Sequence, residues 1–117
     1  MRRIKAALLI AGVLSASCLA QAQDATHEET GQSLAFDNKK GNCLACHAIP
    51  NAHAEMPGNI APPLLAMKLR YPDKSKLRAQ IWDATIANPK TSMPPFGKHK
   101  ILTEEEIDKV TDFIYSM

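Results

Sequence analysis

The sequence is short of cysteine, of long apolar runs and of charge of one sign. Three cysteines in 117 residues are too few for the framework of disulfide bonds that stabilises many small secreted domains. No apolar stretch reaches the roughly 20 residues that a membrane-spanning helix needs. The formal net charge is only +2, and three of the 14 basic residues lie within the first five positions, so no nucleic-acid-binding surface is indicated. A convincing strand pattern is also missing, which favours a small helical domain.

The first 22 residues have the features of a secretory signal peptide. A basic start, Met1-Arg2-Arg3-Ile4-Lys5, precedes an apolar segment over 6–14 and the small-residue cleavage motif Ala20-Gln21-Ala22. We therefore expect residues 1–22 to be removed and residues 23–117 to form one periplasmic domain, with no membrane span in the mature chain. The alternative, lipidation of Cys18, is disfavoured because Ser15 stands where a leucine-like residue is expected.

The run Cys43-Leu44-Ala45-Cys46-His47 is the attachment motif of a c-type haem. Each cysteine sulfur can form a thioether bond to one vinyl group of the porphyrin. The imidazole of His47 is then held beneath the iron as its proximal ligand. The sequence therefore predicts one covalently attached haem c.

Two other interpretations of the paired cysteines are weaker. A redox disulfide between Cys43 and Cys46, as in thioredoxin, would need alternating strands and helices that the sequence does not show. A zinc site would need two further ligands at close spacing, and the available histidines, His53 and His99, form no paired motif. Because Cys18 leaves with the signal peptide, both remaining cysteines belong to the motif.

Apolar periodicity predicts a helix on each side of the motif. The first runs over about residues 26–40, starting at a capping box of Thr26 and Glu29, with Gly41 just past its end. The next runs over about residues 73–87 and ends before a proline. Its apolar face is expected to contain Leu77, Ile81, Ala84 and Ile86.

A third helix completes the domain. It starts at Thr103, which has capping-box spacing to Glu106, while Leu102 and Ile107 are spaced as a hydrophobic staple. Proline-rich loops over 48–64 and 89–101 separate the helices, with a short helical turn near 64–68. The expected fold class is all-α: three main helices, and long loops around one haem.

The second axial ligand of the iron decides the chemistry, because a methionine suits electron transfer and a vacant position suits gas or peroxide binding. Met93 is favoured, since it lies in a stiff loop, Ser92-Met93-Pro94-Pro95-Phe96, far enough along the chain to reach the distal face. Met67 is interpreted as core. Met56 and His99 remain as alternatives, and His53 is too close to His47 in the sequence.

The proximal ligand also needs a hydrogen-bond acceptor for its free Nδ1–H. Pro62 or its neighbours in Ala61-Pro62-Pro63-Leu64 are expected to supply that backbone carbonyl.

In this order of motifs the chain resembles the class I cytochromes c. The order of elements is the same as in that family over nearly the whole mature chain: a helix, the haem motif, a proline-bearing proximal loop, a Met-Pro loop and a C-terminal helix. The resemblance implies a contact between the first and last helices, with Gly31 and Phe36 facing Phe113 or Tyr115. The chain departs from the family at Ala61-Pro62-Pro63-Leu64, where Gly-Pro-x-Leu is usual.

A narrower resemblance is to the SoxX subunits of the thiosulfate-oxidising SoxAX cytochromes. The runs that carry it are Pro57-Gly58-Asn59-Ile60, Leu77-Arg78-Ala79-Gln80-Ile81-Trp82-Asp83-Ala84, Ala87-Asn88-Pro89, Met93-Pro94-Pro95-Phe96-Gly97, Ile101-Leu102-Thr103-Glu104 and Glu106-Ile107-Asp108. The resemblance implies His47 and Met93 as iron ligands and a heterodimer with a SoxA-like haem subunit.

In that family the complex conjugates thiosulfate to a cysteine of a SoxYZ carrier, an L-cysteine S-thiosulfotransferase reaction. The SoxA-like subunit holds the catalytic haem, and the SoxX-like subunit passes electrons to another cytochrome c. No autonomous catalytic site is expected in this chain, which has no evident nucleophile–base pair. A free-standing electron-shuttle cytochrome c is the alternative, and a peroxidatic or ligand-binding haem protein is a third class.

Overall fold

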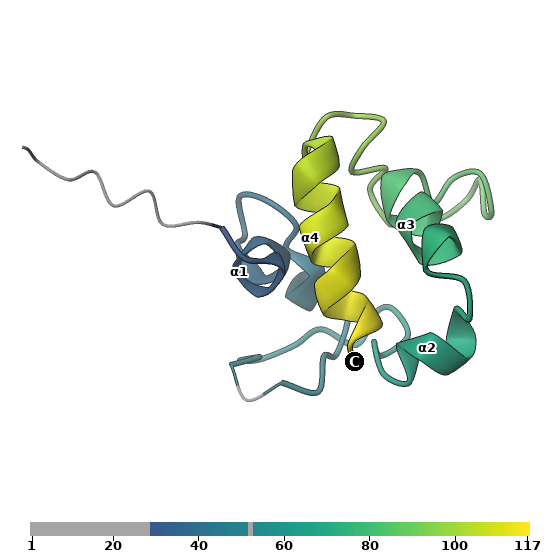
Figure 1. Ribbon diagram of the computed structural model, residues 1–117. Helices are drawn as coiled ribbons and strands as arrows, with labels where there is room; N and C mark the ends of the chain where they lie inside the picture. The colour runs from purple at the N-terminus through teal and green to yellow at the C-terminus, as the bar shows by residue number, and fades with distance from the viewer. Residues whose placement is uncertain (1–28, 52) are drawn as a thin grey trace, which may run out of the picture.

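The computed structural model describes residues 29–51 and 53–117, and that part of the chain is helical without strands. The elements in chain order are α1 (Gly31–Phe36), a 3-10 turn η1 (Cys43–Ala45), α2 (Met67–Arg70), α3 (Lys74–Trp82) and α4 (Glu104–Tyr115). Figure 1 shows α4 in the middle of the domain, with α1 on one side and α2 and α3 on the other. The all-α prediction is confirmed. The signal peptide predicted over residues 1–22 lies outside the described residues.

The longest helix, α4, begins where the sequence predicts. Thr103 is its N-cap, and the capping box with Glu106 is complete: the Thr103 hydroxyl accepts from the Glu106 amide, and the Glu106 carboxylate accepts from the Thr103 amide at 2.7 Å. One face of the helix is buried and forms the centre of the core. Its buried residues are Ile107, Val110, Thr111 and Ile114.

The crossing of α1 over α4 depends on a close approach of the two backbones. A Cβ atom on Gly31 would lie 2.0 Å from the backbone oxygen of Lys109 and 2.8 Å from Cβ of Phe113, so only glycine fits there. Beside it, the rings of Phe36 and Phe113 meet edge to face at a centroid distance of 5.7 Å. The contact between the first and last helices is therefore confirmed. This contact holds α1 in place, and the chain runs from α1 into the cysteine motif.

The first helix is shorter than predicted at both ends. Thr30, and not Thr26, is the N-cap, because its hydroxyl accepts from the amide of Ser33. Thr26 lies outside the described residues. The helix ends at Phe36, after which the Asn42 amide donates to the carbonyl of Asp37 and turns the chain back. Gly41 is thus part of this turn and does not end the helix; its amide donates to the carbonyl of Leu34.

The middle helix, α3, is also shorter than the predicted span of 73–87. Asp73 caps its start, and it ends at Trp82, because the next residue, Asp83, uses its side chain to hold a separate turn at Thr85. Leu77, Ile81 and Ala84 are buried as expected. Ile86 is 80% exposed, so its assignment to the apolar face is wrong.

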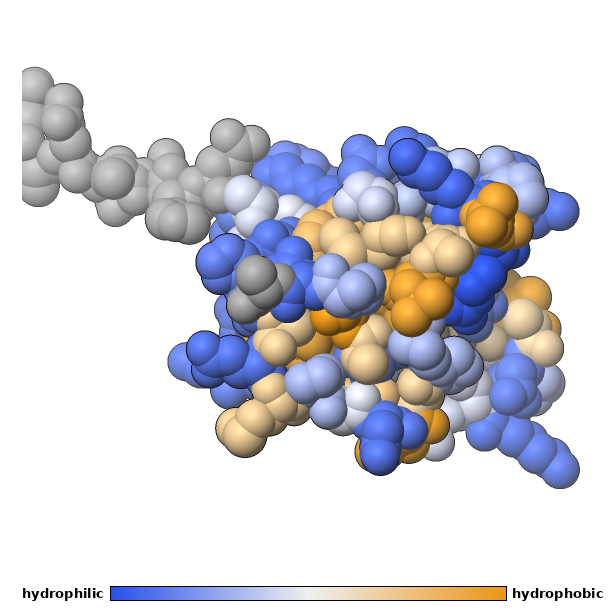
Figure 2. Space-filling view, turned by 90° about the horizontal axis from the view of Figure 1, so that it is seen from below, coloured by the Kyte–Doolittle hydropathy of each residue, from blue (hydrophilic) through white to orange (hydrophobic). Residues whose placement is uncertain are grey.

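Several large apolar side chains are exposed to solvent. Besides Ile86, the most exposed are Met56 at 95%, Leu69 at 83% and Ile60 at 79%, on α2 and on the loop before it. The space-filling view in Figure 2 shows apolar residues gathered in the middle of one face, with hydrophilic residues around them. An apolar area of this kind is typical of a surface that contacts another molecule.

Candidate haem site

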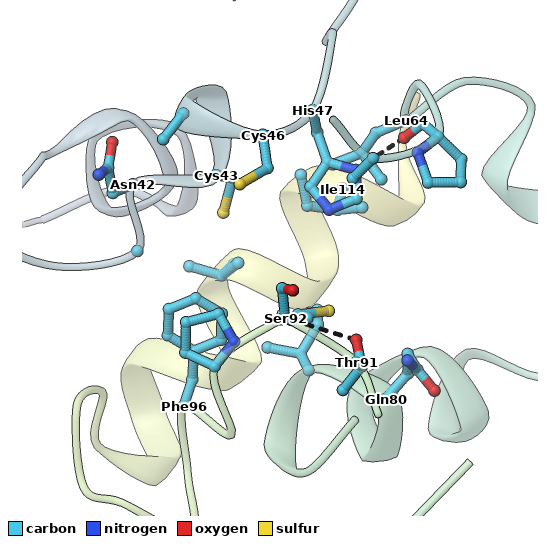
Figure 3. Close-up of a pocket in the computed structure, with 18 of the residues that line it drawn as sticks. Asn42, Cys43, Cys46, His47, Leu64, Gln80, Thr91, Ser92, Phe96 and Ile114 are labelled. Carbon is cyan, nitrogen blue, oxygen red and sulfur yellow. Dashed lines mark hydrogen bonds between the residues drawn. The ribbon is translucent and has the colours of Figure 1, made fainter. Parts of the chain in front are cut away.

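A cavity of about 810 Å³ lies between the cysteine motif and the chain that follows α3. Its size is in the range of pockets that enclose an organic cofactor. The two segments face each other across it: Figure 3 shows Cys43, Cys46 and His47 on one wall, with Thr91, Ser92 and Phe96 on the opposite one. Apolar side chains from α2, α3 and α4 complete the walls: Met67, Leu77, Ile81, Val110 and Ile114.

A tight turn directs both cysteine sulfurs into the cavity. Asn42 has a positive φ of 48°, a conformation that asparagine adopts more readily than most residues, and the turn η1 begins directly after it. The amides of Cys46 and His47 then donate to the carbonyl of Cys43, at 3.2 and 2.9 Å. The turn therefore brings the two thiols and the imidazole of His47 to the same wall, as Figure 3 shows.

The thiol of Cys43 is in an apolar environment. Burial raises its pKa to about 11, and neither Cys43 nor Cys46 is in a disulfide bond. A redox-active dithiol normally has a depressed pKa on its attacking cysteine, because the thiolate is the nucleophile. The pKa of Cys43 is raised and not depressed, which counts against a thioredoxin-like role. Within residues 29–51 and 53–117, no group of three or more His, Cys, Asp or Glu side chains is arranged to hold a metal ion.

The imidazole of His47 is held by the loop predicted to hold it. Its Nδ1 lies 2.6 Å from the backbone oxygen of Pro62, and because a carbonyl can only accept, Nδ1 carries the proton. Nε2 is thereby left with its lone pair available for a metal. The loop is tied to the motif by two backbone hydrogen bonds, from Ala61 to Cys46 at 3.0 Å and from Leu64 to Ala48 at 2.8 Å.

Of the candidates for the second iron ligand, Met93 and Met67 line the cavity. Met93 is half-buried and follows Ser92 on the wall opposite His47, where its amide donates to the Thr91 hydroxyl at 3.1 Å. Met67 is only 1% exposed and packs in the core, as the sequence suggested. The other three candidates are not among the lining residues: Met56, His53 and His99.

The charged side chains that line the cavity are all of one sign. Its lining includes the basic residues Lys39, Lys40, Arg70 and Lys90, and no acidic residue among those described. Lys40 is already paired with Glu29 and Glu106, so the basic character of the rim comes mainly from the other three. The basic residues come from three separate segments of the chain, around positions 39–40, 70 and 90, so no single local motif could have revealed the whole set. Such a lining favours a ligand that carries negative charge at its edge, as the two propionates of a haem do. A covalently attached haem fits this cavity, because its walls supply two thiols, an imidazole, a thioether, apolar side chains and basic residues.

Comparison with known proteins agrees with this geometry. A family model described as "Cytochrome C oxidase, cbb3-type, subunit III" matches residues 29–114. The chain belongs to this cytochrome c family. Among solved structures, it is similar to the crystal structure of SoxXA from P. pantotrophus, with a TM-score of 0.66 and 29% identity, covering 74% of this chain and 77% of that one. No curated protein matches the chain.

These matches make the chain a class I cytochrome c with a SoxX-like fold. The cytochrome binds haem c covalently, and its role is electron transfer.

Among the helices of the described residues, none is long and apolar enough to cross a membrane. Trp82, the single tryptophan, is absent from the described lining of the haem cavity and packs instead against Gly97.

Proposed function

We propose that this cytochrome is the mono-haem electron-transfer subunit of a SoxAX-like complex, with Cys43 and Cys46 as the attachment residues and His47 and Met93 as the iron ligands. One observation carries the haem assignment: both thiols and His47 share one wall of the 810 Å³ cavity, and the segment of Met93 forms the opposite wall. A single cavity of this size between one His and one Met suits one haem.

Each residue of the site has a distinct task in this proposal. Haem c, once bound, supplies a one-electron couple between ferric and ferrous iron. The two cysteines hold the cofactor irreversibly, and Pro62 fixes the orientation of His47 and increases its strength as a donor. A thioether sulfur from Met93 favours the ferrous state and raises the reduction potential. The apolar walls exclude water, and no proton need be exchanged at the site.

Three observations support a role as a subunit. The chain is similar to the SoxXA structure over most of both chains. Its exposed apolar residues Met56 and Leu69, which are not among the described lining residues of the cavity, provide a surface that another protein could cover. Among the described residues, the cysteines are those of the haem motif, so none remains to carry a sulfur substrate. We therefore assign thiosulfate chemistry to a SoxA-like partner acting on a SoxYZ-like carrier, with this subunit passing electrons to another cytochrome c.

The same proposal places the protein in the periplasm. Residues 1–22 would direct export, and residues 23–117 would acquire haem there, where c-type haem is attached in an oxidising compartment. Mass spectrometry of the mature protein tests both points together. We expect a chain that starts at Gln23 and carries the mass of one haem.

The function is tested by co-expressing the chain, a cytochrome c maturation system and the SoxA-like protein from the same genome, with an affinity tag on this chain. We expect a second haem protein to co-purify and thiosulfate to reduce haem only when the SoxYZ-like carrier is present with the complex. A double variant, Cys43→Ser with Cys46→Ser, is the control that lacks haem. A stable monomer that exchanges electrons but never binds the partner would show instead that the protein is a free electron shuttle.

A further inference from the structure

Asp83 is a buried carboxylate that the electron-transfer role leaves unexplained. Its side chain is 5% exposed, and it lies directly after α3. Burying a charge is costly unless partners compensate for it, so such a residue usually holds a specific arrangement in place. It belongs neither to the haem motif nor to the lining of the cavity among the residues described.

The partners of Asp83 come from both ends of one loop. On the near side, its Oδ1 accepts from the amide of Thr85 at 3.0 Å and from the Thr85 hydroxyl. On the far side, its Oδ2 lies 2.9 Å from Nζ of Lys98. One carboxylate therefore joins the first residues of the segment 83–98 to its last residue.

Trp82 and Gly97 close the same loop beside this ion pair. The amide of Gly97 donates to the carbonyl of Trp82 at 3.1 Å. A Cβ atom on Gly97 would lie 1.9 Å from Cε3 of the Trp82 ring, so the loop returns against the indole at a distance that only glycine allows. The two ends of the segment are thus fastened by backbone, ring and charge contacts together.

Met93 lies inside the closed segment. Between the fastened ends, the loop holds itself by short-range bonds: the amide of Thr91 donates to the carbonyl of Asn88 at 3.0 Å, and Met93 donates to Thr91. None of the described hydrogen bonds ties Met93 directly to α3 or α4. Met93 packs against the apolar core, and its place on the cavity wall depends on this packing and on the contacts at the loop's ends.

We propose that Asp83 is a positioning residue that, through Lys98 and Thr85, keeps the loop 83–98 closed and so holds Met93 at the distal face of the haem. This inference rests on the proposed role of Met93 as an iron ligand. Opening the loop would move Met93 away from the iron together with the rest of that wall, while Cys43, Cys46 and His47 stay in place on the other wall. The fraction of molecules in which the loop is open then determines the apparent affinity of an added ligand for the distal position.

The test uses the purified ferric holoprotein and imidazole, which competes with methionine for the distal position. The apparent affinity for imidazole is the intrinsic affinity multiplied by the fraction of open molecules. Asp83→Asn and Lys98→Met both remove the ion pair, so each should increase the apparent affinity by about tenfold. Lys98→Arg keeps a donor for Asp83 and should restore an affinity close to that of the unchanged protein.

Lys100→Met is the matched control, because it removes the same charge two residues away from the loop. Lys100 is exposed and is not among the described lining residues of the cavity, so its variant should bind imidazole as the unchanged protein does. The double variant of Asp83→Asn and Lys98→Met should gain no more affinity than either single variant, since both remove one interaction. Urea unfolding of each holoprotein separates a local effect on Met93 from a general loss of stability.

Two results distinguish the inference from the proposal on which it rests. If the unchanged protein and Met93→Ala have the same spectrum and imidazole affinity, Met93 is not a ligand and the proposed site fails. If Met93→Ala differs from the unchanged protein but Asp83→Asn and Lys98→Met bind imidazole as the Lys100 control does, the positioning role of Asp83 is overturned. Lys98→Met alone decides the matter if Asp83→Asn yields no holoprotein, because it removes only an exposed ammonium group.

Discussion

The substitution Gly31→Ala tests the helix crossing on which the haem cavity is built. The added methyl group would lie 2.0 Å from the carbonyl oxygen of Lys109, far inside van der Waals contact. Because that atom belongs to the backbone of α4, it cannot rotate away as a side chain could. One of the two helices must shift, and the ring contact between Phe36 and Phe113 must change with it.

The expected loss of stability follows from two opposing effects. Overpacking of a well-packed contact costs about 1–3 kcal/mol, and a rigid backbone neighbour places this case at about 3 kcal/mol. Replacing glycine by alanine in a helix contributes at most about 1 kcal/mol in the other direction. The net loss is therefore about 2 kcal/mol, which for a domain of this size lowers Tm by roughly 8–16 °C.

Urea unfolding of the holoprotein, followed by circular dichroism, measures this change. The control is Gln32→Ala, which is the next residue on α1 and whose side chain makes one long hydrogen bond, from Asn51 at 3.5 Å. We expect that control to change the free energy of unfolding by less than about 0.5 kcal/mol. A Gly31→Ala protein that is as stable as the unchanged one, or more stable, would show that the two helices do not cross at this distance.

Three further predictions concern the site and its loop. His47→Ala should prevent stable haem incorporation, and a haem-replete product with an unchanged spectrum would disprove the proximal assignment. Met93→Ala should leave haem attached but lower the reduction potential in a spectroelectrochemical titration, and an unchanged potential would exclude Met93 as ligand. The hydrogen bonds from Thr85 and the charge of Lys98 lower the pKa of Asp83 from its ordinary value of 3.8. Its contribution to stability is therefore complete above that pH and is lost as the pH falls through its lower pKa in the folded protein. The stability difference between the unchanged protein and Asp83→Asn should accordingly be largest near pH 7 and shrink below pH 3.8, as measured by urea unfolding at several pH values.

Local signals predicted α4 well, because they depend on residues close together in the chain. Thr103 and Glu106 satisfy each other's backbone groups within one turn of helix, whatever surrounds them. The apolar stripe of α4 needs only the helical period to be recognised. The same holds for the haem motif, in which two thiols and an imidazole lie within five residues.

The ends of α1 and α3 could not be predicted in the same way. The pair Thr26 and Glu29 has the spacing of a capping box, yet Thr30 caps the helix, because its hydroxyl accepts from Ser33. For α3, the sequence predicted that the helix continues to residue 87, shortly before Pro89. The side chain of Asp83 stops it earlier by bonding to Thr85 and to Lys98, which is 15 positions further along.

The sequence by itself determined the class of the protein: covalent haem, the all-α fold, and His47 supported by a proline-bearing loop. Each of these follows from residue types at fixed, short spacings. Only the tertiary structure decided which side chains meet across the cavity. It brought the segment that contains Met93 to the wall opposite His47, left Met56 exposed, and gathered basic residues from three distant segments around one cavity. Such meetings depend on how helices pack and loops close, and packing is set by the whole core and not by any local pattern.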